Sequence, residues 1–143
     1  MVNLPRVAVV VLRRLNGDFF VHQRHRDKRV YPSLFGLGAG GTLEPGETPE
    51  AAARRELLEE TGLVGEPVFQ VGFTFRGQHR VESFEWVSDT SPNHDDREWQ
   101  WSGWLSTQQV AALRRAGRLC PDTAELWDRL YAPPEPTGSP GVR

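Results

Sequence analysis

The sequence lacks the features that mark secreted, membrane-spanning and nucleic-acid-binding proteins. Its single cysteine, Cys120, excludes an internal disulfide and a cysteine-rich zinc site. Its longest apolar run, residues 7–12, is far shorter than the ~20 residues of a membrane span, and the first six residues lack the layout of a signal peptide. With a formal net charge of -2, no overall field attracts nucleic acid. These absences predict a cytoplasmic protein with neither a membrane nor a nucleic-acid partner.

The length and the composition of the C-terminal end predict one domain and a tail. The chain has 143 residues, which fits a single globular domain. Residues 132–143 contain four prolines and two glycines and predict a disordered tail. We therefore expect a folded domain over residues 1–131.

Apolar runs and turn residues divide the sequence into strands interleaved with helices. Residues 7–12 are unbroken and mostly β-branched, which predicts a strand buried on both faces, and Asn16-Gly17 predicts a hairpin turn after it. Further strands are expected over residues 19–24, 34–43, 67–76, 80–88 and 98–105. Helices are expected from residue 49 to the stop at Gly62, over residues 106–116 and over residues 122–131. This order predicts an α/β or α+β protein with a mixed sheet.

The first predicted helix carries an acidic face. Thr48 is a good N-cap and Gly62 a natural left-handed stop. At about 100° per residue, three glutamates share one sector of the helix: Glu56, Glu59 and Glu60. Arg55 lies at the edge of this sector, while Leu57 and Leu58 lie on the other side, where they can face a core.

Three carboxylates one turn apart repel one another, so this face needs a cation. Mg²⁺ and Mn²⁺ bind oxygen ligands, use a few carboxylates and complete their shells with water and substrate phosphate. Arg55 precedes Glu59 by four residues and can orient its carboxylate. A glutamate near a divalent metal can also deprotonate a water for attack at phosphorus. On helix composition alone, a solvated face lined with glutamates is the alternative.

The spacing of residues 41–63 resembles a complete Nudix box. That pattern is Gly, five residues, Glu, seven residues, Arg-Glu, an aliphatic residue, any residue, Glu-Glu, any residue, Gly and an aliphatic residue. The matching positions are Gly41, Glu47, Arg55, Glu56, Leu57, Glu59, Glu60, Gly62 and Leu63. Chance agreement at a given start is on the order of 10⁻⁹ at ordinary residue frequencies.

The resemblance implies an α/β/α sandwich around a mixed β-sheet. It also implies a Mg²⁺- or Mn²⁺-dependent hydrolase that cleaves a diphosphate linkage in a nucleoside diphosphate derivative. The implied metal ligands are Glu56, Glu59, Glu60 and the Gly41 carbonyl, with one of the glutamates a candidate general base. Glu47 and Arg55 would hold the loop and the glutamates in place, and Gly62 would be structural.

Residues outside the box give further candidates. Many family members carry a glutamate a few residues before a tryptophan on the far loop, and Glu98 fits that pattern as a metal ligand or base; a surface acid is the alternative. Arg24 and Lys28, ahead of the box, can receive a phosphate, with a solvated loop as the alternative. The spacing of His22 and His25 does not converge two rings on a metal.

Two rival functions carry different signatures. Residues 28–35 resemble the approach to the box in the branch related to isopentenyl-diphosphate isomerase, but that chemistry uses a cysteine before the box glycine, where this chain has Gly40. A non-catalytic Nudix-fold module that binds nucleotides usually loses box glutamates, and all of them are present here. The substrate, the number of metal ions and formation of a homodimer stay open.

Overall fold

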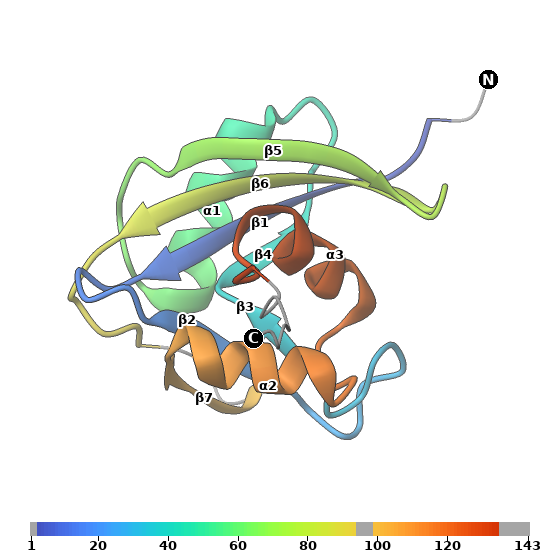
Figure 1. Cartoon of the computed structure of the whole chain (residues 1–143). Coiled ribbons are helices and arrows are strands. Elements are labelled where there is room, and N and C mark those ends of the chain that lie inside the picture. The colour runs from blue at the N-terminus through green and yellow to red at the C-terminus, as the bar shows by residue number, and fades with distance from the viewer. Residues whose placement is uncertain (1–2, 94–98, 135–143) are drawn as a thin grey trace.

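A computed structural model describes residues 3–93 and 99–134 of the chain (Figure 1). The strands are β1 (Arg6–Arg13), β2 (Phe19–Arg24), β3 (Phe35–Leu37), β4 (Ala39–Thr42), β5 (Val68–Phe75), β6 (His79–Val87) and β7 (Trp99–Leu105). The helices are α1 (Pro49–Thr61), α2 (Thr107–Arg115) and α3 (Pro121–Leu130). The order is the predicted one. Most of the predicted tail, residues 135–143, lies outside the described residues.

The strands form one mixed sheet, as the element order predicted. Its path is β3-β2-β1-β6-β5, while β4 also pairs with β1 and β7 with β2. β1 and β6 are parallel along their whole length, and the other strand pairs are antiparallel. β1 therefore lies inside the sheet. β6 pairs along one side of β1, and β4 and β2 pair with different parts of its other side.

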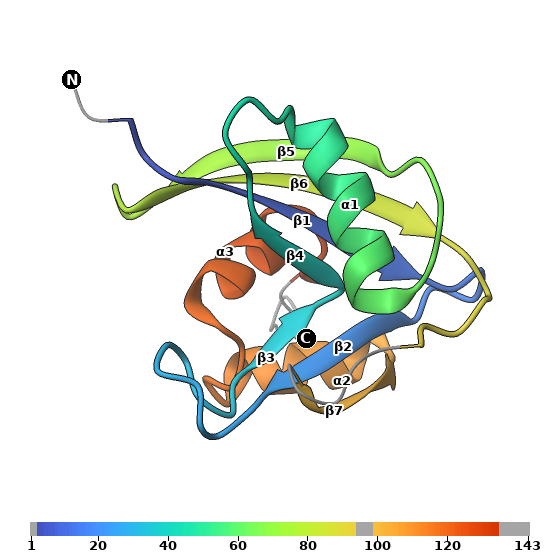
Figure 2. The same cartoon turned by 180° about the vertical axis from the view of Figure 1, so that it is seen from behind.

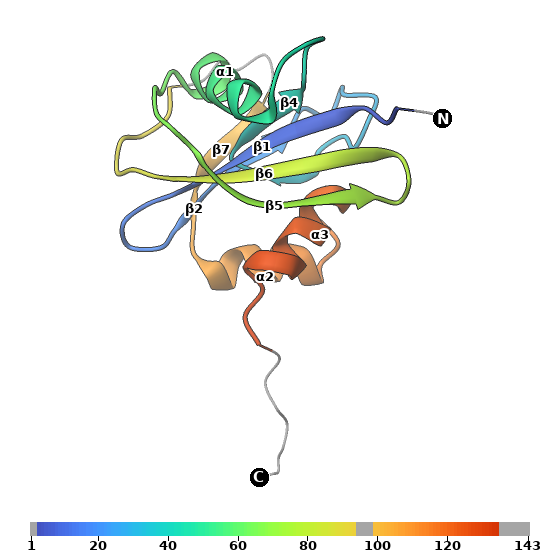
Figure 3. The ribbon, with the colours of Figure 1, turned by 90° about the horizontal axis from the view of Figure 1, so that it is seen from above.

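The sheet separates α1 from the other two helices. Figure 3 shows α1 above the sheet and α2 and α3 below it, and Figure 2 shows α1 lying beside β4 and across β1 and β6. This arrangement is the predicted α/β/α sandwich. Among the described residues, no helix has the length and apolar character needed to cross a membrane.

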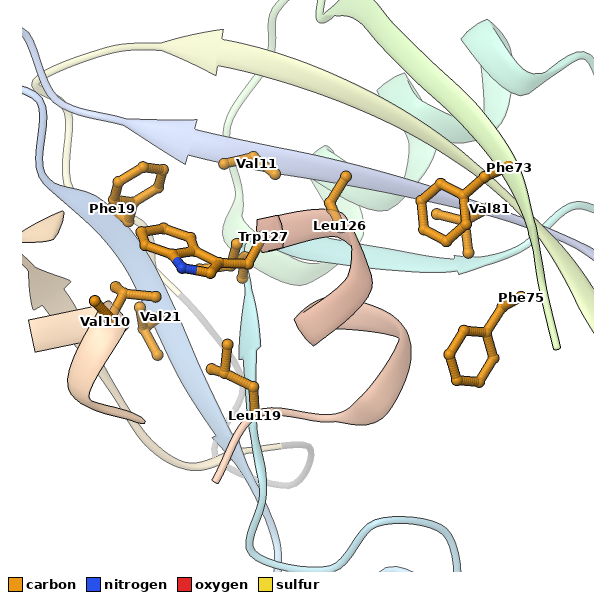
Figure 4. Close-up of a cluster of buried hydrophobic side chains, with 12 residues drawn as sticks. Val11, Phe19, Val21, Phe73, Phe75, Val81, Val110, Leu119, Leu126 and Trp127 are labelled. Carbon is orange, nitrogen blue, oxygen red and sulfur yellow. The ribbon is translucent and has the colours of Figure 1, made fainter. Parts of the chain in front are cut away.

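Each face of the sheet has its own apolar core. On the α1 face, Ala8 and Val10 of β1 are fully buried, while Val11 is fully buried on the opposite face, so the prediction of a strand covered on both sides is confirmed. On the α2/α3 face, Trp127 of α3 packs edge-on against Phe19, with ring centroids 5.2 Å apart (Figure 4). Truncating a buried tryptophan of this kind costs about 3–5 kcal/mol. This anchor fixes α3, and therefore its N-terminus, against the sheet.

The predicted hairpin is present, but its ladder is short. The Arg14 N–H donates to the Asp18 carbonyl at 2.9 Å, closing the turn around Asn16-Gly17. β1 and β2 then share one pair, Arg13 with Phe19. The two strands diverge because β4 occupies the same edge of β1 farther along.

One prediction about α1 is wrong. Leu58 was expected to face a core, but it is 51% exposed. The buried residues of α1 include Ala52, Ala53, Glu56 and Leu57, so the helix is rotated to bring Glu56 toward the sheet. Leu58 is about 100° further round the helix from Leu57 and points outward.

Candidate active site

The ends of α1 are fixed by the residues that the sequence indicated. The Thr48 hydroxyl accepts a hydrogen bond from the Ala51 N–H at 3.1 Å, and Pro49 occupies the first turn. Gly62 adopts the left-handed conformation, φ 76°, and its N–H donates to the Leu58 carbonyl. The helix therefore starts and stops at set positions. This fixes where its glutamates lie along the helix axis relative to β4.

Arg55 is the centre of the box. Its Nε and Nη2 donate to the two carboxylate oxygens of Glu47 at 2.8 and 2.9 Å. Its Nη1 donates to Glu56 at 2.8 Å and to Glu59 at 3.1 Å, and Nη2 also reaches the Thr42 carbonyl at 3.2 Å. One guanidinium thus ties the loop before α1, two glutamates of α1 and the end of β4 together.

Glu47 closes the loop between β4 and α1. It accepts a hydrogen bond from the Glu44 N–H at 2.9 Å besides the two from Arg55. The Arg55 hydrogen bonds, helped by the Glu44 amide, lower the pKa of Glu47 from 4.5 to about 2. The same contacts raise the pKa of the Arg55 guanidinium. Both groups are therefore charged over the whole physiological pH range.

Glu56 is a buried carboxylate that faces Gly41. Glu56 is 8% exposed, and a Cβ added at Gly41 would collide with its carboxylate. Burial raises the pKa of Glu56, and the Arg55 hydrogen bond opposes that rise. A side chain at position 41 would therefore displace the Glu56 carboxylate, which occupies the space where it would stand.

The other two glutamates of the acidic face differ in setting. The Glu59 side chain is 57% exposed and bonds to the same Arg55 nitrogen as Glu56, so the two carboxylates are neighbours. Glu60 accepts a hydrogen bond from the Gly40 N–H of β4 at 2.9 Å. The three glutamates therefore combine one buried carboxylate, one exposed one and one attached to the strand.

These donors fit a hard divalent cation. Carboxylate and carbonyl oxygens are the ligands that Mg²⁺ and Mn²⁺ prefer, and the Glu56 carboxylate lies against the backbone of Gly41. Within residues 3–93 and 99–134, no three His, Cys, Asp or Glu side chains already converge in a metal-binding geometry. Glu56 and Glu59 are held by Arg55 instead. The prediction that Glu98 participates falls outside the described residues.

A cavity of about 470 Å³ adjoins the box. Its wall includes Gly40, Gly41 and Thr42 of β4, and Val7 and Val9 of β1. Val9 and Gly40 are direct partners in the sheet, as are Val7 and Thr42, so the cavity lies on the α3 face while Glu56 lies on the α1 face. β4 is shared by the two. A cavity of this size is typical of small-molecule sites.

Only one of the two predicted phosphate-binding residues, Arg24 and Lys28, lines the cavity. Arg24, the last residue of β2, lines the wall and donates from Nε to the Val30 carbonyl at 2.9 Å. Lys28 is not among the lining residues; it lies in the loop that follows β2, and its N–H donates to the His25 carbonyl at 3.1 Å. The structure therefore brings Arg24, and not Lys28, to the cavity.

The wall also contains residues that sequence reasoning did not select. His79 Nε2 lies 3.1 Å from Asp122 Oδ2, at the start of β6 and in the first turn of α3. Cys120 lines the same wall and is buried. His79 is 43 residues from Asp122 in the sequence, and no local motif connects the two.

Comparison with known proteins assigns the family. The NUDIX domain family model matches residues 3–126. The chain belongs to the Nudix family. A Nudix hydrolase from Deinococcus radiodurans is 29% identical over 133 residues, which cover 88% of this chain and 78% of that protein. The nucleoside triphosphatase NudI from an Enterobacter species is 35% identical over 79 residues, or 55% of each chain.

Solved structures agree with the assignment to the Nudix fold. The crystal structure of a Deinococcus radiodurans protein has a TM-score of 0.78 to this chain at 27% identity, covering 89% of this chain and 83% of that one. A MutT protein from Methanosarcina mazei Go1, at 21% identity and a TM-score of 0.66, shares the fold. Nudix hydrolases generally use divalent metal ions.

Proposed function

We propose that this Nudix domain hydrolyses the diphosphate linkage of a nucleoside diphosphate derivative, or of a related organic diphosphate, with Mg²⁺ or Mn²⁺ bound to the box. The observation that carries the proposal is the Glu56 carboxylate, buried against Gly41 and hydrogen-bonded to Arg55. Keeping a carboxylate charged in a buried place is costly unless a cation balances it. Arg55 supplies one positive charge, but it is shared by Glu47, Glu56 and Glu59, so the carboxylates outnumber it. The arrangement is therefore suited to metal binding rather than to a solvated helix face.

The box residues divide into ligands and supports. Metal ligands in this proposal are Glu56, Glu59, Glu60 and the Gly41 carbonyl. Arg55 and Glu47 hold them in place through the hydrogen bonds described above. When bound, the cation supplies a water of lowered pKa and neutralises phosphate charge.

The proposed reaction is attack of a water molecule at phosphorus. The water oxygen forms a bond to phosphorus, the bridging P–O bond breaks, and the leaving phosphate departs with the bridging oxygen. A carboxylate accepts the proton lost by the water. Candidates for this base are the three box glutamates and Glu98.

The cavity beside β4 is the proposed site of the organic part of the substrate. Val7 and Val9 give it an apolar floor, and Arg24 gives it a guanidinium that can bind a phosphate oxygen. Gly40 and Gly41 belong both to the box strand and to the cavity wall, so β4 is the element that the two parts of the proposed site share. The name of NudI supports a nucleoside phosphate as the substrate class.

Mass-spectrometric product analysis tests the proposal. The panel contains nucleoside triphosphates, sugar nucleotides, dinucleotides and isopentenyl diphosphate, each with Mg²⁺, with Mn²⁺ and with chelator. We expect metal-dependent cleavage by the unmodified chain and its loss in Glu60→Gln. Glu50→Gln changes an exposed glutamate in the first turn of the same helix and is the matched control.

Other outcomes of the panel contradict the proposal. Conversion of isopentenyl diphosphate to an isomer of equal mass, separated by chromatography, would indicate an isomerase. Tight nucleotide binding without turnover of any panel member would indicate a binding module. Cleavage that persists at full rate in chelator would exclude the metal-dependent reaction.

A further inference from the structure

His22 of β2 binds the backbone of the glycine-rich segment that leads into the box. Its Nδ1 lies 2.7 Å from the Gly38 carbonyl oxygen. A carbonyl oxygen only accepts, so Nδ1 carries the proton and donates. The family pattern that identified the box assigns no role to this histidine.

Gly38, the residue that His22 contacts, forms the bend between β3 and β4. Gly38 has φ 61°, and a side chain there would collide with the Val10 carbonyl. The Gly38 N–H donates to the Phe20 carbonyl at 2.8 Å. Both backbone polar groups of Gly38 therefore end on β2, one on its main chain and one on the His22 side chain.

The imidazole itself stacks on a buried ring and occupies the space beside a glycine. It stacks on Trp99 with ring centroids 4.6 Å apart and planes 10° from parallel. A Cβ added at Gly36 would stand 2.6 Å from its Nε2, so a side chain there would displace the ring. Trp99 is 5% exposed, and His22 is half-buried against it. The stack sets the plane of the imidazole, and the bond to Gly38 sets the direction of Nδ1.

A second hydrogen bond with a side chain holds the backbone just after Gly38. Two residues on, the Gly40 N–H donates to Glu60 at 2.9 Å, and the Gly41 carbonyl follows directly. We infer that His22 is a positioning residue: with Glu60, it fixes residues 38–41 so that the Gly41 carbonyl oxygen is in place for the divalent cation. This inference rests on the proposed function of the box, because it concerns the same cation.

Three substitutions at position 22 separate the hydrogen bond from the ring. Phenylalanine keeps an aromatic ring for the stack on Trp99 but has no donor. Asparagine places an N–H close to the position of Nδ1 without a ring, and leucine has the shape of asparagine without a donor. The measured quantity is the Kd for Mn²⁺, followed by the electron paramagnetic resonance of the free ion, with the full chain and no substrate.

We expect His22→Phe and His22→Leu to bind Mn²⁺ at least about tenfold more weakly than the unmodified chain, and His22→Asn to stay within about threefold of it. His25→Phe makes the same change three residues away and should bind Mn²⁺ normally. Circular dichroism and thermal melting establish that each variant is folded. Gly36→Ala, which pushes the imidazole from its place, should weaken Mn²⁺ binding even if the position-22 variants do not fold.

Two results would overturn the inference: unchanged Mn²⁺ affinity in folded His22→Phe, or equally weak binding by the asparagine and leucine variants. The readout separates this failure from failure of the proposed function. An unmodified chain that binds Mn²⁺ but hydrolyses nothing would contradict the hydrolase and leave the role of His22 standing. An active hydrolase whose Mn²⁺ affinity does not change with substitutions at position 22 would support the proposed function and contradict the role of His22.

Discussion

Arg55 donates to both carboxylate oxygens of Glu47, at 2.8 and 2.9 Å, and its third nitrogen, Nη1, donates to Glu56 and Glu59. A planar guanidinium can do this because its donors form a rigid fork. Nε and Nη2 hold Glu47 and thereby the loop before α1, and Nη1 orients the carboxylates of Glu56 and Glu59. Glu47 thus affects the acidic face through Arg55 without touching it.

Arg55→Lys is therefore expected to be damaging although it keeps the charge. An ammonium group cannot donate in parallel to two oxygens of Glu47 and still reach Glu56 and Glu59. We expect the Kd for Mn²⁺ to rise about 10–100-fold, measured by electron paramagnetic resonance. Arg54→Lys, in an exposed pair with Glu66 at 3.4 Å, is the neighbouring control and should bind normally. Equal affinity of the two variants would show that the fork geometry is dispensable.

Glu47 predicts a pH dependence of stability with a definite sign. Its pKa in the folded chain is about 2, below the ordinary value of 4.5, because Arg55 favours the charged form. Its contribution is therefore fully present above pH 4.5 and is lost as the pH falls toward 2. The difference in unfolding free energy between the unmodified chain and Glu47→Gln should shrink over that interval, measured by urea unfolding at a series of pH values.

The Arg55→Lys background controls this measurement. With the fork removed, the effect of Glu47→Gln on unfolding free energy should depend less on pH, because the hydrogen bonds that lower the pKa of Glu47 are gone. If Arg55 is intact and the effect of Glu47→Gln on the unfolding free energy stays the same from pH 6 to pH 2, the assignment of Arg55 as the cause is contradicted.

The part of the site that lies in α1 was predictable because its determinants are local. Thr48 and Gly62 mark the ends of the helix, and helical periodicity puts Glu56, Glu59 and Glu60 on one side. The rotation of the helix was not predictable in the same way. Leu58 is exposed because the approach of Glu56 to Gly41, a contact with another element, decides which side is buried.

The remainder of the site depends on long-range packing. His79 and Asp122 meet across 43 residues of sequence, and neither lies in a recognisable motif. The spacing of His22 and His25 argues against a shared metal site, and the sequence indicates no other role for His22. A histidine on a strand facing a segment with four glycines is a signal for a side-chain bond to backbone, but pairing of β2 with β3 has to be known before it can be used.

Cys120 should be almost unreactive in the folded chain. Burial, helped by Asp122, raises the pKa of this thiol from 9.0 to about 12. At pH 8 the thiolate fraction is then about a thousandfold below that of an ordinary thiol. We expect iodoacetamide to modify the native chain at least about a hundredfold more slowly than the urea-unfolded chain, followed by mass spectrometry.

An exposed thiol is the control for that experiment. In Cys120→Ser/Ser91→Cys the single thiol stands at an exposed position, so native and unfolded chains should react at similar rates. Rapid labelling of native Cys120 would mean that the region at the start of α3 opens readily, and that the thiol is not protected by its burial.

The contact between Gly41 and Glu56 can be measured by a double-mutant cycle in metal-free buffer. A methyl group at position 41 has no room beside the Glu56 carboxylate, so Gly41→Ala should destabilise the fold by about 1–3 kcal/mol, the usual cost of overpacking. In the Glu56→Ala background the carboxylate is gone, and the same substitution should cost much less. Urea unfolding of the four chains gives the interaction term. A cost of Gly41→Ala that is the same in both backgrounds would place the strain in the strand itself, and Glu56 would not be the reason for glycine at position 41.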